Sequence, residues 1–166
     1  MTTVTLNGDP MNTNGELPKP GDVAPEFELT GGDLQTVRLS DHANRKVLLN
    51  IVPSLDTPTC AASARCFNEA FADRKDVVVL VISADLPFAQ GRFCSTEGLD
   101  NVIPLSMMKD RRFAEDYGVL LVDGPLAGLA ARAVVLVDEA GTVMYTQLVE
   151  DIADEPDYSA VLAALA

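Results

Sequence analysis

The residues around the first cysteine have the types and order needed for thiol chemistry. Cys60 follows Thr57, Pro58 and Thr59. Threonine is a good N-cap and proline suits the first helical position, so this order predicts a helix with Cys60 in its first turn. There the sulfur faces unpaired backbone N–H groups and the positive end of the helix, which favours the thiolate over the thiol. The sequence therefore predicts a reactive sulfur at Cys60.

The two other cysteines, Cys66 and Cys94, do not complete a disulfide framework of the secreted type. Three cysteines are too few and too unevenly spaced for one, and an odd number leaves at least one thiol free. Cys66 lies on the same predicted helix as Cys60, about 9 Å farther along its axis, which is beyond disulfide reach. We therefore expect Cys66 to be a partly buried, chemically idle thiol.

A metal site has little support in the pattern. The only histidine, His42, lies in the polar connection LSDHANRK, which predicts a solvated loop. A zinc site built from His42 and the three cysteines is an alternative, but the chain lacks the paired C-x-x-C spacing typical of zinc ligands. No Gly-rich phosphate loop occurs either.

Apolar runs predict the strands that must position Cys60. Three of them are nearly continuous, which is typical of strands covered on both faces, and they span residues 47–52, 77–83 and 132–138. Two further strands are expected at 102–106 and 142–149. The short turn DEAG joins the strand at 132–138 to the strand at 142–149. At the N-terminus we expect short strands within 4–12 and a hairpin over 27–40. Gly31-Gly32 is expected to supply the positive φ of that second turn.

Helical patterns lie between these strands. Ala64, Phe67 and Phe71 form an apolar stripe within 58–73, and Leu86, Ala89 and Phe93 repeat that spacing within 86–97. Further helices are expected at 109–118, closing on Gly118, and at 154–166, with Pro156 in the first turn. The order resembles a thioredoxin-like α/β fold: a central mixed β-sheet flanked by helices, with an N-terminal β-hairpin extension, in one domain over 1–166.

The charge of the chain excludes some classes of partner. The net charge is −13, and no cluster of Lys or Arg offsets it, so we expect binding neither to nucleic acid nor to anionic membranes. The N-terminus lacks the pattern of a signal peptide, and the longest apolar run is far too short to span a bilayer. We expect a soluble, cytoplasmic protein.

Four stretches carry a family resemblance. PSLDTPTC places Pro53, Thr57 and Cys60 in the P-x-x-x-T-x-x-C arrangement of peroxiredoxins. SADLPFAQGRFCSTEGLDNVIPLS, DGPLAGLAARAVVLVDE and TQLVEDIADEPDYSAVL are similar to the bacterial thiol peroxidases (Tpx). The four stretches occur in order over nearly the whole chain, which resembles an atypical 2-Cys peroxiredoxin.

The resemblance implies a role for five residues. Cys60 would be the peroxidatic nucleophile and Cys94 the resolving cysteine, which forms an intramolecular disulfide with it. Thr57 would hydrogen-bond peroxide and thiolate, Pro53 would shape the loop, and Arg132 would hold the thiolate and the developing charge. The expected activity is a thioredoxin-dependent reduction of hydrogen peroxide and organic hydroperoxides, by a homodimer without metal, flavin or haem. Cys66 departs from the family, which commonly has a basic residue there.

Two predictions follow when these implied roles are combined with chemistry. Arg132 lies at the head of a buried strand, where a charge needs a partner, and a thiolate would be one. Cysteines on separate helices usually start beyond the roughly 7 Å between Cα atoms that a disulfide allows, so the helix around Cys94 must unwind. Gly91 weakens that helix, and we expect residues 90–98 to open during turnover.

Two other functions use the same residues. A redox sensor would form the same Cys60–Cys94 disulfide but would change a binding surface instead of turning over. A protein dithiol–disulfide oxidoreductase would need Cys-x-x-Cys, whereas Ser63 occupies the third position after Cys60.

Overall fold

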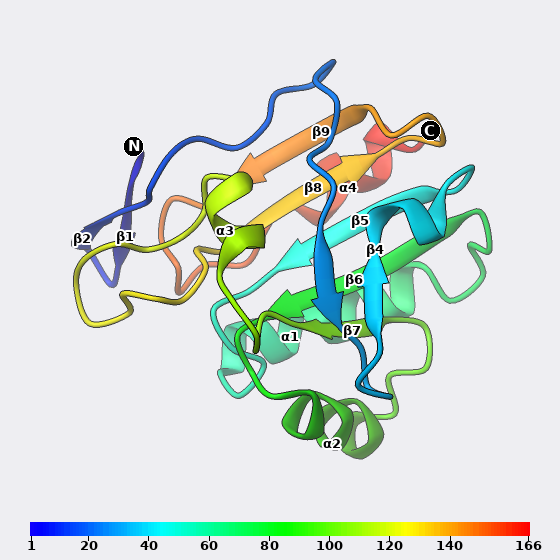
Figure 1. Ribbon diagram of the computed structural model, residues 1–166, viewed down its shortest axis with the longest axis horizontal. Coiled ribbons are helices and arrows are strands. Elements are labelled where there is room, and N and C mark those ends of the chain that lie inside the picture. Colours follow the sequence, from blue (N-terminus) through cyan, green and yellow to red (C-terminus); the bar gives the residue numbers. More distant parts are fainter.

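The computed structural model describes residues 1–166, which form a seven-stranded mixed sheet and a separate two-stranded hairpin (Figure 1). The strands of the large sheet, in spatial order, are β4 (Thr36–Arg38), β3 (Glu28–Thr30), β7 (Ile103–Ser106), β6 (Val77–Ser83), β5 (Lys46–Ile51), β8 (Ala133–Val137) and β9 (Val143–Leu148). Strands β5, β6 and β7 are parallel, whereas β8 runs antiparallel to β5 and β9 antiparallel to β8. The predicted mixed sheet is confirmed.

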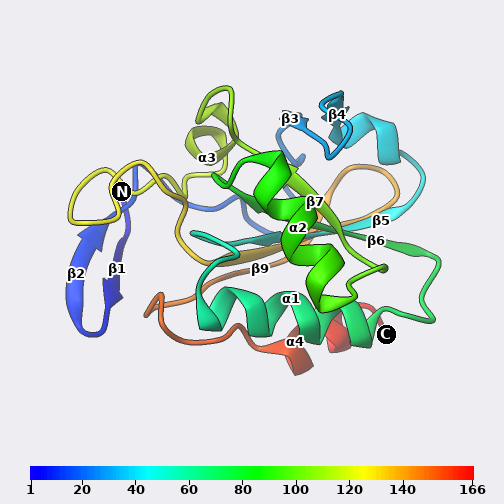
Figure 2. The same ribbon diagram turned by 90° about the horizontal axis from the view of Figure 1, so that it is seen from below.

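Helices cover both faces of this sheet. They are α1 (Pro58–Ala70), α2 (Pro87–Glu97), α3 (Arg112–Asp116), α4 (Tyr158–Ala164) and the short 3₁₀ helix η1 (Leu39–His42). Figure 2 shows α1 and α4 together on one face, with α3 and the β3–β4 hairpin on the other. Helix α2 lies alongside β7, at the end of the parallel part of the sheet (Figure 1). No helix is both long enough and apolar enough to span a bilayer.

The central strands are mostly apolar because both of their faces are buried. Leu48 of β5 and Val134 of β8 pack into the core cluster beneath α1 and α4. Their neighbours Leu49 and Val135 point to the opposite face and join the second core cluster. Alternation along a strand therefore places the apolar side chains of β5 and β8 in one core or the other.

Helix α1 buries the predicted stripe, but α2 does not. Phe67 and Phe71 lie in the core beneath α1, and burying a phenylalanine contributes about 1.5–3 kcal/mol. The predicted stripe of α2 is wrong, since Leu86 is exposed and precedes the helix. Gln90 faces the protein instead, and its amide donates to the Ser83 hydroxyl and the Leu105 carbonyl at 3.0 and 2.8 Å. Polar groups therefore anchor the first half of α2, whereas Phe93 and Cys94 of its second half pack against the core cluster beneath α1.

Three local predictions are also corrected. In the β3–β4 hairpin, Leu34 and not Gly31-Gly32 adopts the positive φ, at 67°. Pro156 precedes α4 rather than lying in its first turn, and the N-cap is Asp157, whose carboxylate accepts from the Ala160 amide. His42 is half-buried at the end of η1 rather than in a solvated loop.

The N-terminal hairpin consists of β1 (Thr3–Leu6) and β2 (Asp9–Asn12). Asn7 and Gly8 form its turn with φ of 51° and 90°, the left-handed conformation that the tightest hairpins require. The hairpin lies at the end of the molecule toward which β9 points (Figure 1). It therefore lies beside the segment that leads from β9 to α4.

Candidate active site

Cys60 occupies the predicted place in the first turn of α1. Thr57 is the N-cap residue and Pro58 the first helical residue, so Cys60 is third, and its side chain is fully buried. The Thr57 side chain does not cap the helix, contrary to expectation; its hydroxyl donates to the Ser54 carbonyl at 3.0 Å. The amides of Thr59 and Cys60 meet no acceptor within the protein. The helix therefore begins with unpaired N–H donors beside the sulfur.

The Cys60 sulfur is the partner that the buried charge of Arg132 requires. Arg132 is 1% exposed, and its Nη2 donates to the Cys60 sulfur at 3.2 Å. Arg132 directly precedes β8, whose Ala133 pairs with Ile51 at the end of β5. The chain runs from Ile51 through the loop into α1, so the sheet brings together two residues 72 positions apart.

A backbone carbonyl orients this guanidinium. Nε and Nη2 of Arg132 both donate to the carbonyl oxygen of Ile152, at 3.0 and 2.8 Å. Nη1 is buried and has no hydrogen-bond partner. Sequence reasoning missed Ile152, because any residue can supply a carbonyl and the sequence carries no signal for it.

The loop before α1 is held by a carboxylate that sequence reasoning also missed. Asp85 follows β6 and accepts from the Ser54 hydroxyl and the Leu55 amide, both at 2.7 Å. The Ser83 hydroxyl donates to the same carboxylate at 2.7 Å. Pro53 is buried at the start of this loop. The signal was available, since side chains that follow neighbouring parallel strands gather at one edge of the sheet.

Cys94 lies half-buried on α2 and packs against the core cluster that contains Cys60. Burial raises the pKa of the Cys94 thiol, so the closed helix favours the protonated form. Beyond Gln90, however, most residues of α2 are exposed. The second half of the helix therefore has few contacts that would resist opening.

Cys66 and Ser63 occupy the remaining positions of interest on α1. Burial, followed by the charges of Glu155 and Glu69, raises the pKa of the Cys66 thiol. These surroundings fit the predicted idle thiol. The buried Ser63 hydroxyl donates to the Cys60 carbonyl at 3.0 Å and accepts from the Asn50 amide at 3.3 Å. Ser63 thus braces the first turn in the position where a dithiol oxidoreductase would carry its second cysteine.

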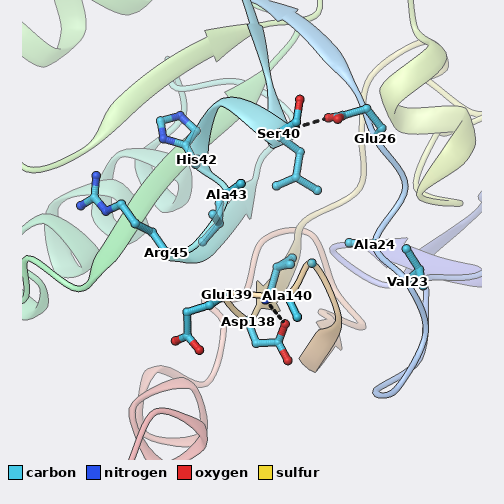
Figure 3. A pocket seen from close by; sticks show the side chains of 14 residues that line it. Val23, Ala24, Glu26, Ser40, His42, Ala43, Arg45, Asp138, Glu139 and Ala140 are labelled. Atoms are coloured by element: carbon cyan, nitrogen blue, oxygen red, sulfur yellow. Dashed lines mark hydrogen bonds between the residues drawn. The ribbon is translucent and has the colours of Figure 1, made fainter.

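Two cavities can be placed relative to these residues. A cleft of about 490 Å³ lies between the loop before α1 and α2, lined among others by Leu55, Asp85 and Phe93. A cavity of about 320 Å³ lies at the opposite ends of β5 and β8, where His42 and Glu139 lie on its rim (Figure 3). No cysteine lines that second cavity. Cys60, Cys94 and Arg132 line neither of the two, but the first cleft adjoins the loop that leads to Cys60 and the helix that carries Cys94.

Comparison with known proteins agrees with this arrangement. The sequence profile of the Redoxin family matches residues 19–162. The thiol peroxidase of Mycobacterium bovis is 53% identical over 165 residues, which cover 99% of both chains. That of Corynebacterium glutamicum is 52% identical over the same share.

A solved structure extends the likeness to the fold. The peroxiredoxin-like protein from Aquifex aeolicus superposes with a TM-score of 0.92 at 42% identity, covering 98% of this chain and 95% of the other. The sheet described above is thus the thioredoxin-like sheet that the sequence predicted. The chain belongs to the Redoxin family and, within it, to the thiol peroxidases of the peroxiredoxin group.

Proposed function

We propose that this peroxidase reduces hydrogen peroxide and organic hydroperoxides with Cys60 as its nucleophile. The observation that carries the proposal is the buried hydrogen bond of 3.2 Å from Arg132 to the Cys60 sulfur. A guanidinium at this distance favours the negatively charged thiolate. It also remains in place as negative charge moves onto the peroxide, so it costs no reorganisation during the reaction.

In the first step the Cys60 thiolate attacks one peroxide oxygen. The S–O bond forms while the O–O bond breaks, and the departing oxygen takes a proton to leave as water or an alcohol. The unpaired Nη1 of Arg132 and the free amides of the first turn supply donors for that oxygen. The product on the enzyme is the sulfenic acid of Cys60.

Thr57 and Pro53 shape the place where peroxide binds. The Thr57 hydroxyl donates its hydrogen bond to the Ser54 carbonyl, so its oxygen can only accept a hydrogen bond, here from the hydroperoxide O–H. Pro53 is buried at the other end of the same loop and limits its freedom. Both roles orient the substrate rather than react with it.

In the second step Cys94 resolves the sulfenic acid. Its thiolate attacks the Cys60 sulfur and the S–O bond breaks, and the departing oxygen takes up the proton that Cys94 released and leaves as water, which produces an intramolecular disulfide. Thioredoxin then reduces this disulfide by thiol–disulfide exchange: its dithiol supplies the two electrons and becomes a disulfide. No metal, flavin or haem takes part. We further propose a cytoplasmic homodimer.

Two linked measurements test the proposal. The protein is treated with one equivalent of peroxide, free thiols are alkylated, and peptides are mapped by mass. The expected result is a Cys60–Cys94 linkage with Cys66 alkylated. A Cys60–Cys66 linkage, or a lasting sulfenic acid with Cys94 free, would contradict the resolving step.

The second measurement follows NADPH consumption with thioredoxin, thioredoxin reductase and excess peroxide. We expect continuous turnover that Cys60→Ser abolishes and Cys66→Ser leaves unchanged. A sensor would consume about one equivalent of NADPH and then stop. That result would contradict the proposal of a thioredoxin-dependent peroxidase.

A further inference from the structure

The orientation of Arg132 depends on a loop that has no regular structure of its own. Ile152 lies in the segment between β9 and α4, and its carbonyl accepts from two nitrogens of the guanidinium. A shift of this carbonyl would move the guanidinium away from the sulfur. Other parts of the protein therefore have to hold the segment in place, and the contacts that do so affect the position of the guanidinium.

The N-terminal hairpin supplies those contacts. The Thr5 amide donates to the Glu150 carbonyl and the Ile152 amide donates to the Thr5 carbonyl, each at 2.8 Å. Thr5 and Asp151 thus form a parallel bridge between β1 and the loop. The Ile152 side chain is buried in the same core cluster as Val4 and Met11 of the hairpin.

Asp151 concentrates the polar contacts of this junction. Its carboxylate accepts from the Thr5 hydroxyl at 2.7 Å, from the Gly8 amide at 3.0 Å and from the Asn7 amide at 3.2 Å. The left-handed turn at Asn7 and Gly8 turns both amides toward it. Asp151 also accepts from the Ala153 amide at 2.9 Å, so the same carboxylate stabilises the turn of its own loop and binds the hairpin.

The same loop also touches the helix of the nucleophile. The Ala153 carbonyl accepts from the Thr59 hydroxyl at 2.9 Å, next to Cys60 in the first turn of α1. The loop thus contacts both partners of the Arg132–Cys60 pair, one through Ile152 and the other through Ala153. Its position determines how these two groups meet.

We infer that Asp151 is a positioning residue for the peroxidase reaction, which ties the N-terminal hairpin to the Ile152 carbonyl and through it fixes Arg132 against Cys60. This inference rests on the proposed function, since it assumes that the pair of Arg132 and Cys60 performs the attack on peroxide. The hairpin, which stands apart from the large sheet in Figures 1 and 2, thereby becomes part of the active-site scaffold.

The charge of Asp151 persists under all ordinary conditions. The Thr5 hydroxyl, followed by the amides of Ala153, Gly8 and Asn7, lowers the pKa of this carboxyl from 3.8 to about 2. A lowered carboxyl pKa adds stability above the ordinary value, and that stability is lost as the pH falls through the lowered one. The contact is therefore constant near neutral pH.

Asp123 offers a matched control. Like Asp151, it binds the hairpin through its carboxylate, accepting from the Asn12 amide and the Asn12 side chain at 2.8 Å each. Its hydrogen bonds reach only β2, and none reaches the loop that carries Ile152. Loss of Asp123 removes hydrogen bonds to β2, whereas Asp151 binds β1 and the turn, so this loss does not release the carbonyl that holds Arg132.

The test compares Asp151→Ala, Asp151→Asn and Thr5→Val with Asp123→Ala. The readouts are the rate constant for oxidation of Cys60 by hydrogen peroxide, followed by rapid quench and mass spectrometry, and the pH profile of Cys60 alkylation. Misplacement of a catalytic group by about 1 Å costs on the order of 100-fold, so we expect both Asp151 variants to lose about 10- to 100-fold. Their alkylation profiles should move to higher pH. In both readouts Thr5→Val should fall between the Asp151 variants and the wild type, and Asp123→Ala should match the wild type.

Wild-type rates in Asp151→Asn and Thr5→Val would overturn the inference, as would equal losses in Asp123→Ala and Asp151→Ala. The two substitutions Asp151→Asn and Thr5→Val keep the test decisive if Asp151→Ala does not fold. Failure of the proposed function has a different signature. In that case Arg132→Lys or Cys60→Ser would itself retain peroxide reactivity, whatever the Asp151 variants do.

Discussion

Arg65 on α1 and Glu97 on α2 form an ion pair of 3.3 Å between Nη1 and Oε2. This pair joins the helix that carries Cys60 to the last turn of the helix that carries Cys94. If Cys94 reaches Cys60 by unwinding the second half of α2, the pair has to break first. It therefore opposes the resolving step, although it takes no part in the chemistry.

Removing this ion pair should speed disulfide formation. An exposed pair contributes about 0.2–1 kcal/mol, so Arg65→Gln should accelerate the step by up to about fivefold. The measurement is single-turnover disulfide formation after rapid mixing with peroxide, quenched with acid and alkylated. Arg38→Gln, which removes the Arg38–Glu28 pair on the β3–β4 hairpin, is the control and should leave the rate unchanged. A slower rate in Arg65→Gln would contradict the role assigned to the pair.

Stiffening α2 should have the opposite effect. A Cβ at Gly91 meets no atom within 4 Å and φ there is not positive, so alanine fits without strain. Alanine stabilises a helix interior by about 0.5–1 kcal/mol relative to glycine, so Gly91→Ala should slow disulfide formation about two- to fivefold.

Hydrogen exchange gives the matching structural readout for Gly91→Ala. The amides of residues 91–98 should exchange faster than those of β5 and β6 in the wild type and become more protected in the variant. Gly32→Ala, at an equally open position in the β3–β4 turn, serves as the control. Protection of 91–98 equal to that of the core strands in the wild type would exclude the opening.

Arg132 should be irreplaceable by lysine. An ammonium cannot donate to the Ile152 carbonyl and the Cys60 sulfur with the planar geometry of a guanidinium. Loss of one preorganised donor to a developing charge costs about 2.7–4 kcal/mol, so Arg132→Lys should lower the rate constant with peroxide by about 100- to 1,000-fold. Thermal unfolding of the variant must be measured alongside, because Arg132 is also buried. Full reactivity in a folded Arg132→Lys protein would refute its role.

The resolving step should become faster as the pH rises. Burial raises the pKa of Cys94 in the closed helix, so the closed form keeps its proton where an opened chain has lost it. Stability from a raised pKa is present below the unfolded value and lost as the pH rises through the folded one, so opening becomes easier in alkali. Disulfide formation should therefore accelerate as the pH rises from about 8.5, the ordinary thiol value, toward the raised value of the closed helix. Single-turnover rates across this range test this, and a flat profile would count against it.

Local patterns were enough to predict the sheet and the position of Cys60 in the first turn of a helix. Continuous apolar runs identified β5, β6 and β8, because a strand buried on both faces leaves few polar positions. Thr57 and Pro58 located the start of α1 and thereby placed Cys60 in its first turn. Each of these inferences depends on a few neighbouring residues, which the chain order itself supplies.

Predictions that depended on what a segment packs against were less secure. The apolar spacing of Leu86, Ala89 and Phe93 suggested a buried face, yet α2 is anchored through Gln90, because the ends of β6 and β7 offer it hydrogen-bond partners. Similarly, Thr57 had the side chain of an N-cap, but its hydroxyl found the nearer acceptor at Ser54. A propensity states what a residue can do, and the surrounding chain selects among the possibilities.

The sequence by itself therefore determined the sheet, the helix that carries Cys60 and the residue types of the site. Only the tertiary structure decided which groups meet there: Arg132 with the Cys60 sulfur, the Ile152 carbonyl with Arg132, and Asp151 with the N-terminal hairpin. The physical reason is that these contacts join segments far apart in the chain, and one of them uses a backbone carbonyl that every residue possesses. No local pattern encodes such a contact, because it exists only once the strands have aligned.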